Sequence, residues 1–236
     1  MANNAPVPLI LTRPRAAADR FFASLPKELR AQFDPVFSPL IEIVPLDAEA
    51  PIGARDGAIF SSANGVAAAP PGAGRIAYCI GPTTTKAATQ QGWTAIQSGK
   101  NADGLVAALT DLRPGAHLVH LSGINTRGDI AERLCAAGLS VSHVALYDQA
   151  LCPMTQEAQH LIATAHEVVC PLFSARTATQ FVACAHQLSS VHVVALSPAV
   201  AQVFSATTPR SLSIADTPDA QSMGVSLAEV VRRNRL

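Results

Sequence analysis

The chain has 236 residues, enough for one large domain or two small ones, and 17 basic and 17 acidic residues give it a formal net charge of zero. Only 14% of its residues are charged and 49% are apolar, which argues against a broadly basic nucleic-acid surface or a polybasic membrane patch. No apolar run approaches the roughly 18 residues of a membrane-spanning helix, and the first residues lack the pattern of a secretory signal. The five cysteines are odd in number and widely spread, which favours reduced thiols in a cytoplasmic protein.

Short apolar runs alternate with helix-like segments along the whole chain, a pattern typical of parallel α/β construction. The predicted strands, in chain order, are Pro8–Thr12, Gly57–Ser61, Arg75–Ile80, Ala116–Leu121, Glu167–Phe173 and Val191–Leu196. The predicted helices are Arg15–Leu29, Pro82–Gln91, Ala102–Leu112, Thr126–Ala137, Thr155–Ala165, Ala175–Leu188, Pro198–Ser205 and Ala220–Arg232.

Two long extended runs, Phe37–Leu46 and Val141–Leu151, have no helix beside them and fall at matching places in two similar halves of the chain. This pattern predicts two α/β lobes with parallel sheets, a flavodoxin-like lobe and a related one, joined by a two-stranded β-ladder. Lobe one would comprise residues 1–38 with 153–236, lobe two residues 48–142, and the ladder residues 39–47 and 143–152. Two such lobes facing each other would create a cleft.

Four polar loops join the end of a predicted strand to the start of a helix, where open α/β sheets bind ligands. They are Ser61–Asn64, Gly81–Thr84, Ser174–Arg176 and Ser197–Ala199. Each helix start offers free backbone N–H groups and a positive dipole end, which suit carboxylates or phosphates. Ser, Thr and Asn are also the preferred N-caps, so capping alone would account for any one loop. Their occurrence in symmetric pairs favours ligand binding.

Motifs for other chemistry are absent from the sequence. It contains no Gly-x-Gly-x-x-Gly, no Walker Gly-Lys-Ser/Thr and no Gly-x-Ser-x-Gly, and its seven histidines lack metal-ligand spacing. His120 and His192 lie in predicted strands, where a role in the core or on the surface is expected. Neither a nucleotide nor a metal therefore has a specific signal.

Three further residues are candidates for a functional role. Arg13 directly follows the first predicted strand, where a cation at a helix start is mildly unfavourable and calls for a reason. Arg127 occupies the equivalent turn in the second half. Tyr147, one of only two tyrosines, lies in the second extended run, where it is either a buried aromatic with a hydrogen-bonded hydroxyl or a functional group.

At these residues the sequence resembles the uroporphyrinogen-III synthase family over essentially its whole length. The family's short motifs occur in order as 11-LTRP-14, 39-PLIEIVPL-46, 62-SANGV-66, 80-IGPTT-84, 101-NADGL-105 and 173-FSARTA-178, with Tyr147 in the place of a hinge tyrosine. The chain departs from the family pattern at 121-LSG-123, where Leu-Arg-Gly is common, and at 197-SPAV-200, which lacks a second threonine.

The resemblance implies an enzyme that closes the linear tetrapyrrole hydroxymethylbilane into uroporphyrinogen III, with loss of water and inversion of the last ring, and without a metal or organic cofactor. It implies Tyr147 as the group that protonates or hydrogen-bonds the leaving hydroxyl. The residues expected to bind the substrate's acetate and propionate groups are Arg13, Ser62, Asn64, Gly81, Thr84, Arg127, Ser174 and Ser197.

The fold alone leaves open a second reading, a non-catalytic two-lobed protein that binds an anion or a tetrapyrrole. We expect a cytoplasmic monomer with no nucleic-acid or membrane partner. A transient coupling to the preceding deaminase of the pathway stays open at this level.

Overall fold

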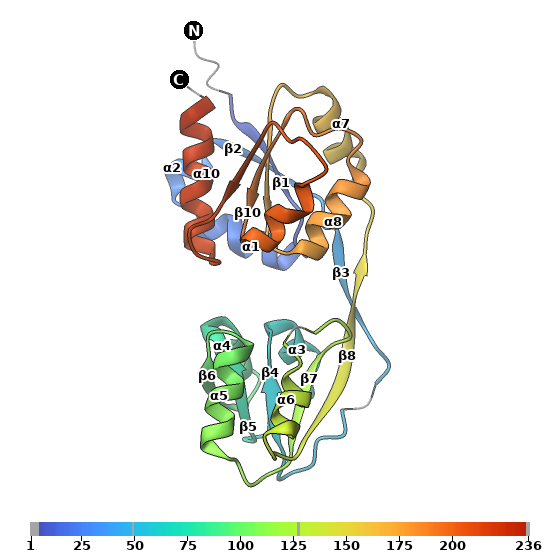
Figure 1. Ribbon diagram of the computed structural model, residues 1–236, viewed down its shortest axis with the longest axis vertical. Coiled ribbons are helices and arrows are strands. Elements are labelled where there is room, and N and C mark those ends of the chain that lie inside the picture. The colour runs from blue at the N-terminus through green and yellow to red at the C-terminus, as the bar shows by residue number, and fades with distance from the viewer. Residues whose placement is uncertain (1–4, 49, 127, 235–236) are drawn as a thin grey trace. The chain divides into compact units, whose positions relative to one another are not determined.

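The computed structural model describes residues 5–48, 50–126 and 128–234, and it divides into two compact units (Figure 1). Unit 1 comprises residues 1–42 and 151–236, and unit 2 comprises residues 43–150. The chain leaves unit 1 within β3 (Ile41–Pro45) and returns within β8 (Val141–Leu151), and these two strands are neighbours in one sheet. Two sheets of mostly parallel strands confirm the predicted α/β class.

The sheet of unit 1 has the order β11-β10-β9-β1-β2, and all of its pairings are parallel. Its strands are β1 (Val7–Leu11), β2 (Phe33–Phe37), β9 (Val168–Leu172), β10 (Val191–Ala195) and β11 (Ser211–Ile214). Counted within the unit this order is 2-1-3-4-5, the flavodoxin-like arrangement, and the direction of progression reverses between β1 and β9.

Helices cover both faces of this sheet (Figure 1). One face carries α1 (Arg15–Ser24), α2 (Lys27–Arg30) and α10 (Ala220–Asn234). The other carries α7 (Gln156–Thr164), α8 (Ala175–Cys184), α9 (Pro198–Ala201) and the 3₁₀ turn η1 (Gln202–Phe204). Within β1, Leu9 and Leu11 pack into the first layer while Ile10 packs into the second. A strand that is covered on both faces must be apolar at every position, and this explains why the sequence of β1 is a continuous apolar run.

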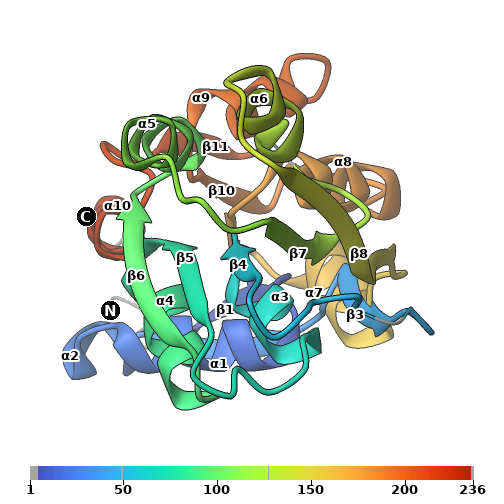
Figure 2. The same ribbon diagram turned by 90° about the horizontal axis from the view of Figure 1, so that it is seen from below.

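The sheet of unit 2 has the order β3-β8-β7-β4-β5-β6. Its remaining strands are β4 (Gly57–Phe60), β5 (Ile76–Ile80), β6 (Thr94–Gly99) and β7 (Leu118–Gly123). The progression reverses between β4 and β7, the counterpart of the reversal in unit 1. On one face lie α3 (Ala63–Ala68) and α4 (Gly81–Gln90), and on the other lie α5 (Ala102–Leu112) and α6 (Ile130–Ala136) (Figure 2).

Several predicted helices have different bounds in the structure; the one predicted over Ala175–Leu188, for example, ends at Cys184. Two of the differences have a clear local cause. The segment predicted as one helix over Arg15–Leu29 ends at Ser24 and restarts at Lys27, because Pro26 caps the second helix from an extended conformation and cannot continue the first. The helix predicted over Thr126–Ala137 begins only at Ile130, since Gly128 and Asp129 both have positive φ.

None of the described helices has both the length and the apolar character that a membrane crossing requires. The five cysteines all lie within the described residues, and none of them forms a disulfide. Cys79 and Cys170 are fully buried, and burial raises the pKa of the Cys79 thiol to about 11. The buried cysteines therefore act as small apolar side chains of the core.

Candidate functional site

Polar residues follow the strands that flank the reversal point of each sheet. In unit 1, Arg13 comes shortly after β1 and Ser174 shortly after β9. In unit 2, Ser61 and Ser62 come directly after β4, and Ser122 is the last residue but one of β7. Open α/β sheets bind ligands outside the carboxyl ends of such strands. Each unit therefore has a candidate site at the carboxyl ends of its strands, where the sequence motifs predicted one.

Tyr147 is the most informative residue of the site in unit 2. It lies in β8, is 3% exposed, and its Oη is 3.1 Å from Oγ of Ser62, so either hydroxyl can donate to the other. Ser62 is the N-cap of α3 and its Oγ also accepts a hydrogen bond from the Gly65 N–H at 3.3 Å. A predicted catalytic residue and a predicted binding residue, 85 positions apart, are thus joined by one hydrogen bond.

The ring of Tyr147 is held from its other side by the end of β7. A Cβ atom on Gly123 would lie 2.6 Å from Cε2 and 2.9 Å from Cζ of the tyrosine, so the ring packs directly on the glycine backbone. The Ile124 N–H donates to the Tyr147 carbonyl at 2.9 Å. The tyrosine is therefore fixed by packing at its ring and by a hydrogen bond at its hydroxyl.

The other predicted binding residues are at helix starts. Ser174 is the N-cap of α8, and its Oγ accepts from the Thr177 N–H at 3.1 Å. Ser197 is the N-cap of α9 but makes no side-chain capping bond. Gly81, with φ of +73°, begins α4, which likewise has no side-chain cap. Pro82 and Pro198 carry no N–H, and the Val200 N–H donates to the Ser197 carbonyl at 3.0 Å, so the first-turn donors that can serve an anionic ligand include those of Thr83 in α4 and Ala199 in α9.

Two of these predicted residues are more buried than a position in a surface loop would imply. Thr84 is only 5% exposed, and Asn64 lies in the first turn of α3 and is partly buried. Asn64 is the second residue of α3, so its backbone N–H is one of the donors that a helix start leaves without an intrahelical partner. Thr84 is the fourth residue of α4, where the N–H takes part in the helix's own bonding, so only Asn64 fits a contact through the backbone.

Arg13 is held by an aromatic ring rather than by an acid. Its Cζ lies 4.4 Å from the centroid of the Phe173 ring, and among the described residues no acidic side chain forms an ion pair with it. Burial, and then the charge of Arg20, lower the pKa of its guanidinium, which nevertheless stays charged at neutral pH. A cation that is stacked on a ring rather than paired with an acid is well suited to receive a carboxylate.

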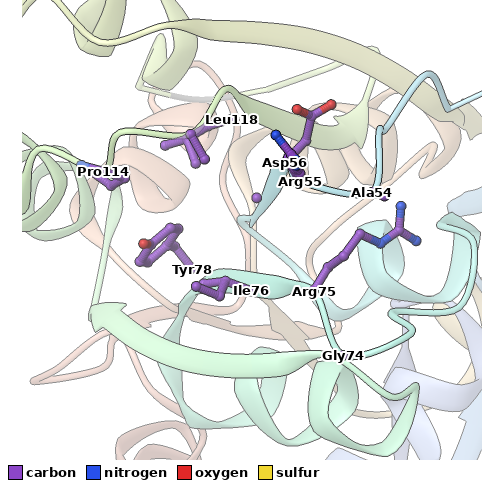
Figure 3. A pocket seen from close by; sticks show the side chains of 11 residues that line it. Ala54, Arg55, Asp56, Gly74, Arg75, Ile76, Tyr78, Pro114 and Leu118 are labelled. Atoms are coloured by element: carbon purple, nitrogen blue, oxygen red, sulfur yellow. The ribbon is translucent and has the colours of Figure 1, made fainter.

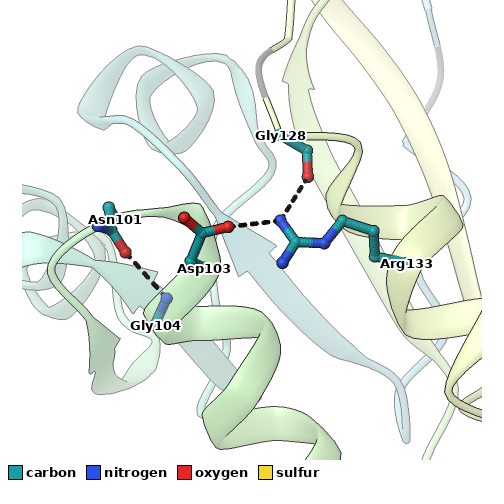
Figure 4. Close-up of polar contacts among 5 residues, drawn as sticks. All are labelled: Asn101, Asp103, Gly104, Gly128 and Arg133. Atoms are coloured by element: carbon teal, nitrogen blue, oxygen red, sulfur yellow. Dashed lines mark hydrogen bonds and ion pairs between the residues drawn. The ribbon is translucent and has the colours of Figure 1, made fainter.

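Arg127, the predicted counterpart of Arg13 in the second half, lies outside the described residues. Arg133, six positions later and on α6, donates to Asp103 Oδ1 of α5 at 2.8 Å and to the Gly128 carbonyl at 3.2 Å (Figure 4). This pair links two helices and closes the turn before α6. Arg133 thus serves the fold of unit 2.

Two histidine–serine pairs link neighbouring strands of unit 2. Nε2 of His120, on β7, is 3.3 Å from Oγ of Ser61, and Nε2 of His143, on β8, is 2.7 Å from Oγ of Ser122. The two imidazole centroids are 5.3 Å apart. His120 is 2% exposed, and burial together with the nearby His143 lowers its pKa to about 4.

The low pKa of His120 predicts a pH-dependent stability. Between pH 6.5 and pH 4, His120 is protonated in the unfolded chain but stays neutral in the folded chain. The stability that the neutral, buried histidine contributes is therefore complete above pH 6.5 and is lost as the pH falls towards 4. The loss amounts to roughly 3 kcal/mol at most. Urea unfolding at pH 7, 6 and 5 should show a weaker dependence in His120→Gln than in wild type, whereas a variant of the exposed His160, His160→Gln, should keep the wild-type dependence. Equal slopes in all three proteins would contradict this origin.

A separate cavity of about 220 Å³ lies at the opposite ends of the strands in the sheet of unit 2 (Figure 3). Gly57, Ile76 and Leu118, the first residues of β4, β5 and β7, line it together with Tyr78. It is therefore at the amino ends of the strands and does not include any of the predicted site residues. Among the described residues, no group of three or more His, Cys, Asp or Glu side chains gathers as a metal site would.

The hydrogen bonds of the two histidines were not predicted from the sequence. One signal could have found part of this arrangement: His120 and Ser122 are two residues apart in a strand, so both point to one face of the sheet. The partners on β4 and β8 depend on the strand order, which no local pattern reveals.

Comparison with known proteins supports one family. The model of the family described as "Uroporphyrinogen-III synthase HemD" matches residues 25–224. The solved uroporphyrinogen-III synthetase of Helicobacter pylori is similar with a TM-score of 0.68 at 13% identity, covering 97% of this chain and 100% of that one. A mutant uroporphyrinogen III synthase from Thermus thermophilus is similar with a TM-score of 0.50 at 13% identity, covering 97% and 98%. No match was found among curated proteins.

Proposed function

The chain belongs to the uroporphyrinogen-III synthase family, and from that premise we propose which of its residues carry the family's reaction. The reaction closes hydroxymethylbilane into uroporphyrinogen III with loss of water and inversion of the last ring. The chain is thus a cyclising enzyme of tetrapyrrole biosynthesis, a conclusion that rests on the family match over residues 25–224.

Substrate binding is assigned to the helix starts and to Arg13. The substrate presents acetate and propionate groups, and backbone N–H groups at a helix start bind such carboxylates. In unit 1 these donors come from the starts of α8 and α9, near Ser174 and Ser197, and in unit 2 from the starts of α3 and α4. Holding the flexible bilane in one folded geometry selects which carbon of the last ring attacks, which is the main catalytic requirement of the reaction.

Tyr147 is proposed as the catalytic residue. The step that starts ring closure expels a hydroxyl group, and a phenol can donate a hydrogen bond or a proton to the departing oxygen. The 3.1 Å contact with Ser62 supports this role, because the serine can take the phenolic hydrogen bond before the substrate arrives and return one afterwards. Ser62 at the same time presents the start of α3 to a carboxylate.

Product analysis tests the proposed function. The purified protein would be incubated with freshly generated hydroxymethylbilane, the products oxidised, and the two ring-closure isomers separated. We expect isomer III in excess over the symmetric isomer I that forms without enzyme. Isomer I alone, at the unaided rate, would support the second candidate, a protein that binds a tetrapyrrole without converting it.

Arg13→Gln is expected to raise KM roughly tenfold and to change kcat little, because a stacked guanidinium that contacts a carboxylate contributes on the order of 1–3 kcal/mol to binding. KM of the wild type should rise with salt more steeply than KM of the variant. Arg233→Gln, a change in an exposed ion pair on α10, serves as the control and should leave KM unchanged. An unaltered KM in Arg13→Gln would remove this residue from the binding site.

Two further assignments belong to this proposal. We infer that the protein works as a monomer in the cytoplasm, and that it receives hydroxymethylbilane from the preceding deaminase through a transient contact. Sedimentation of the purified chain, alone and mixed with that deaminase, tests the monomer and the transient contact, and fractionation of cells that produce the chain tests the location. A stable dimer or the absence of any interaction would exclude the corresponding assignment.

A further inference from the structure

Tyr147 contacts two short segments of unit 2, and each segment is tied to a histidine. The tyrosine hydroxyl meets Ser62, whose neighbour Ser61 is bonded to His120. The tyrosine ring packs on Gly123, whose neighbour Ser122 is bonded to His143. Both histidine–serine bonds run between neighbouring strands, β7 to β4 and β8 to β7.

The hydrogens of the stronger pair can be assigned from its partners. Oγ of Ser122 is 3.2 Å from the Gly123 carbonyl, to which it donates, and 2.7 Å from Nε2 of His143. A serine has one hydrogen to donate, so its second bond must be accepted from an Nε2–H of His143. This chain of donors runs from His143 through Ser122 to the carbonyl of Gly123, the residue on which the tyrosine ring rests.

The two histidines differ in their exposure. His120 and Ser122 are 2% and 1% exposed, whereas His143 is exposed to solvent. Replacing His143 therefore costs little in core packing and tests the arrangement without unfolding unit 2. His120 lies in the core, where an apolar replacement would leave the Ser61 hydroxyl without this partner.

We propose that His143, and His120 with it, are positioning residues for the ring-closure reaction, because through Ser122 and Ser61 they fix the two segments that hold Tyr147. This inference rests on the proposed catalytic role of Tyr147. The histidines themselves contact Ser122 and Ser61, and they act on the reaction only through the position of the tyrosine.

Kinetics of matched variants test this inference. His143→Phe, which removes the Nε2–H, should lower kcat about tenfold with KM within about twofold of wild type. His143→Gln, whose amide N–H can take the place of Nε2–H, should recover most of kcat. His117→Phe is the control, because His117 makes the same kind of bonds, to Ser140 at 2.8 Å and Ser142 at 3.0 Å, at the amino end of the same strands. An unchanged kcat in His143→Phe, or an equal loss in His143→Gln, would overturn the proposal.

A double-variant cycle separates this proposal from the role of Tyr147. If His143 acts through the tyrosine, His143→Phe should cause little further loss in a protein that already carries Tyr147→Phe. Independent losses that multiply would overturn the positioning role while leaving the tyrosine in the mechanism. Normal turnover of Tyr147→Phe alone would instead exclude the catalytic role of Tyr147.

A spectroscopic measurement addresses position without any activity. The chain has two tyrosines, so incorporation of 3-fluorotyrosine gives two fluorine resonances, and Tyr78→Phe identifies that of Tyr147. His143→Phe should shift or broaden the Tyr147 resonance, and His117→Phe should not. A Tyr147 resonance that is the same in His143→Phe and wild type would overturn the inference whatever the kinetics show.

Discussion

Tyr147→Phe should lower kcat roughly a hundredfold, because a positioned proton donor contributes about 10²–10⁴ to such a step, while KM stays within a few-fold of wild type. The variant keeps the ring that packs on Gly123 and loses only the hydroxyl that meets Ser62 at 3.1 Å. The measurement is the initial rate of isomer III formation from freshly prepared hydroxymethylbilane, corrected for the unaided formation of isomer I.

Tyr78→Phe is the matched control for this prediction. Tyr78 lies in β5 of the same unit and lines the cavity at the amino ends of the strands, away from the predicted site residues. Its replacement should leave kcat unchanged. If the two variants turn over at the same rate as wild type, the phenol of Tyr147 takes no part in the reaction.

Gly65→Ala is the change with the largest expected effect on stability. A Cβ atom at this position would lie 2.6 Å from the carbonyl oxygen of Leu121 in β7, and neither the helix nor the sheet backbone can move aside cheaply. Alanine is otherwise favoured in a helix by roughly 0.5–1 kcal/mol, which offsets part of the overpacking cost of about 1–3 kcal/mol or more. We expect a net loss of about 2 kcal/mol, measured as the free energy of unfolding in urea.

The same substitution should also reduce activity. The Gly65 N–H donates to Ser62 Oγ, so a displaced α3 weakens the cap and with it the contact to Tyr147. Gly115→Ala is the control, since a Cβ there meets nothing within 4 Å, and it should alter stability by less than about 0.5 kcal/mol. Equal stabilities of the two variants would show that α3 can move away from β7 without cost.

The strands that the sequence failed to predict have one feature in common: β2, β6 and β11 are all edge strands. The interior strand β10 is buried at every position and has an almost wholly apolar sequence, whereas β11 alternates between partly buried and exposed residues. An edge strand has fewer covering neighbours and therefore needs fewer apolar residues. Its formation depends on the strand that it pairs with, which lies elsewhere in the sequence.

The candidate site was predictable as a set of residues but not as a set of contacts. Loops between strands and helices can be located from local sequence, so Ser62 and Ser174 were named and both are N-caps. The bond between Ser62 and Tyr147 depends on β8 and β4 both lying beside β7, and such an order follows from the packing of the whole unit. The ring beneath Arg13 belongs to Phe173, 160 positions further along the chain, for the same reason.

The strand order of unit 1 determines when its strands can pair while the chain is being synthesised on the ribosome. β1 is paired on both sides, with β2 and with β9, and all of unit 2 is translated between these partners. At roughly 5–20 residues per second, β1 and β2 wait several seconds for β9, with one edge of β1 open to wrong partners. Unit 2 is continuous in the chain and can fold during that interval. We therefore expect nascent chains in which residue 150 has just left the ribosome to contain a protease-resistant unit 2 beside an unfolded amino-terminal segment.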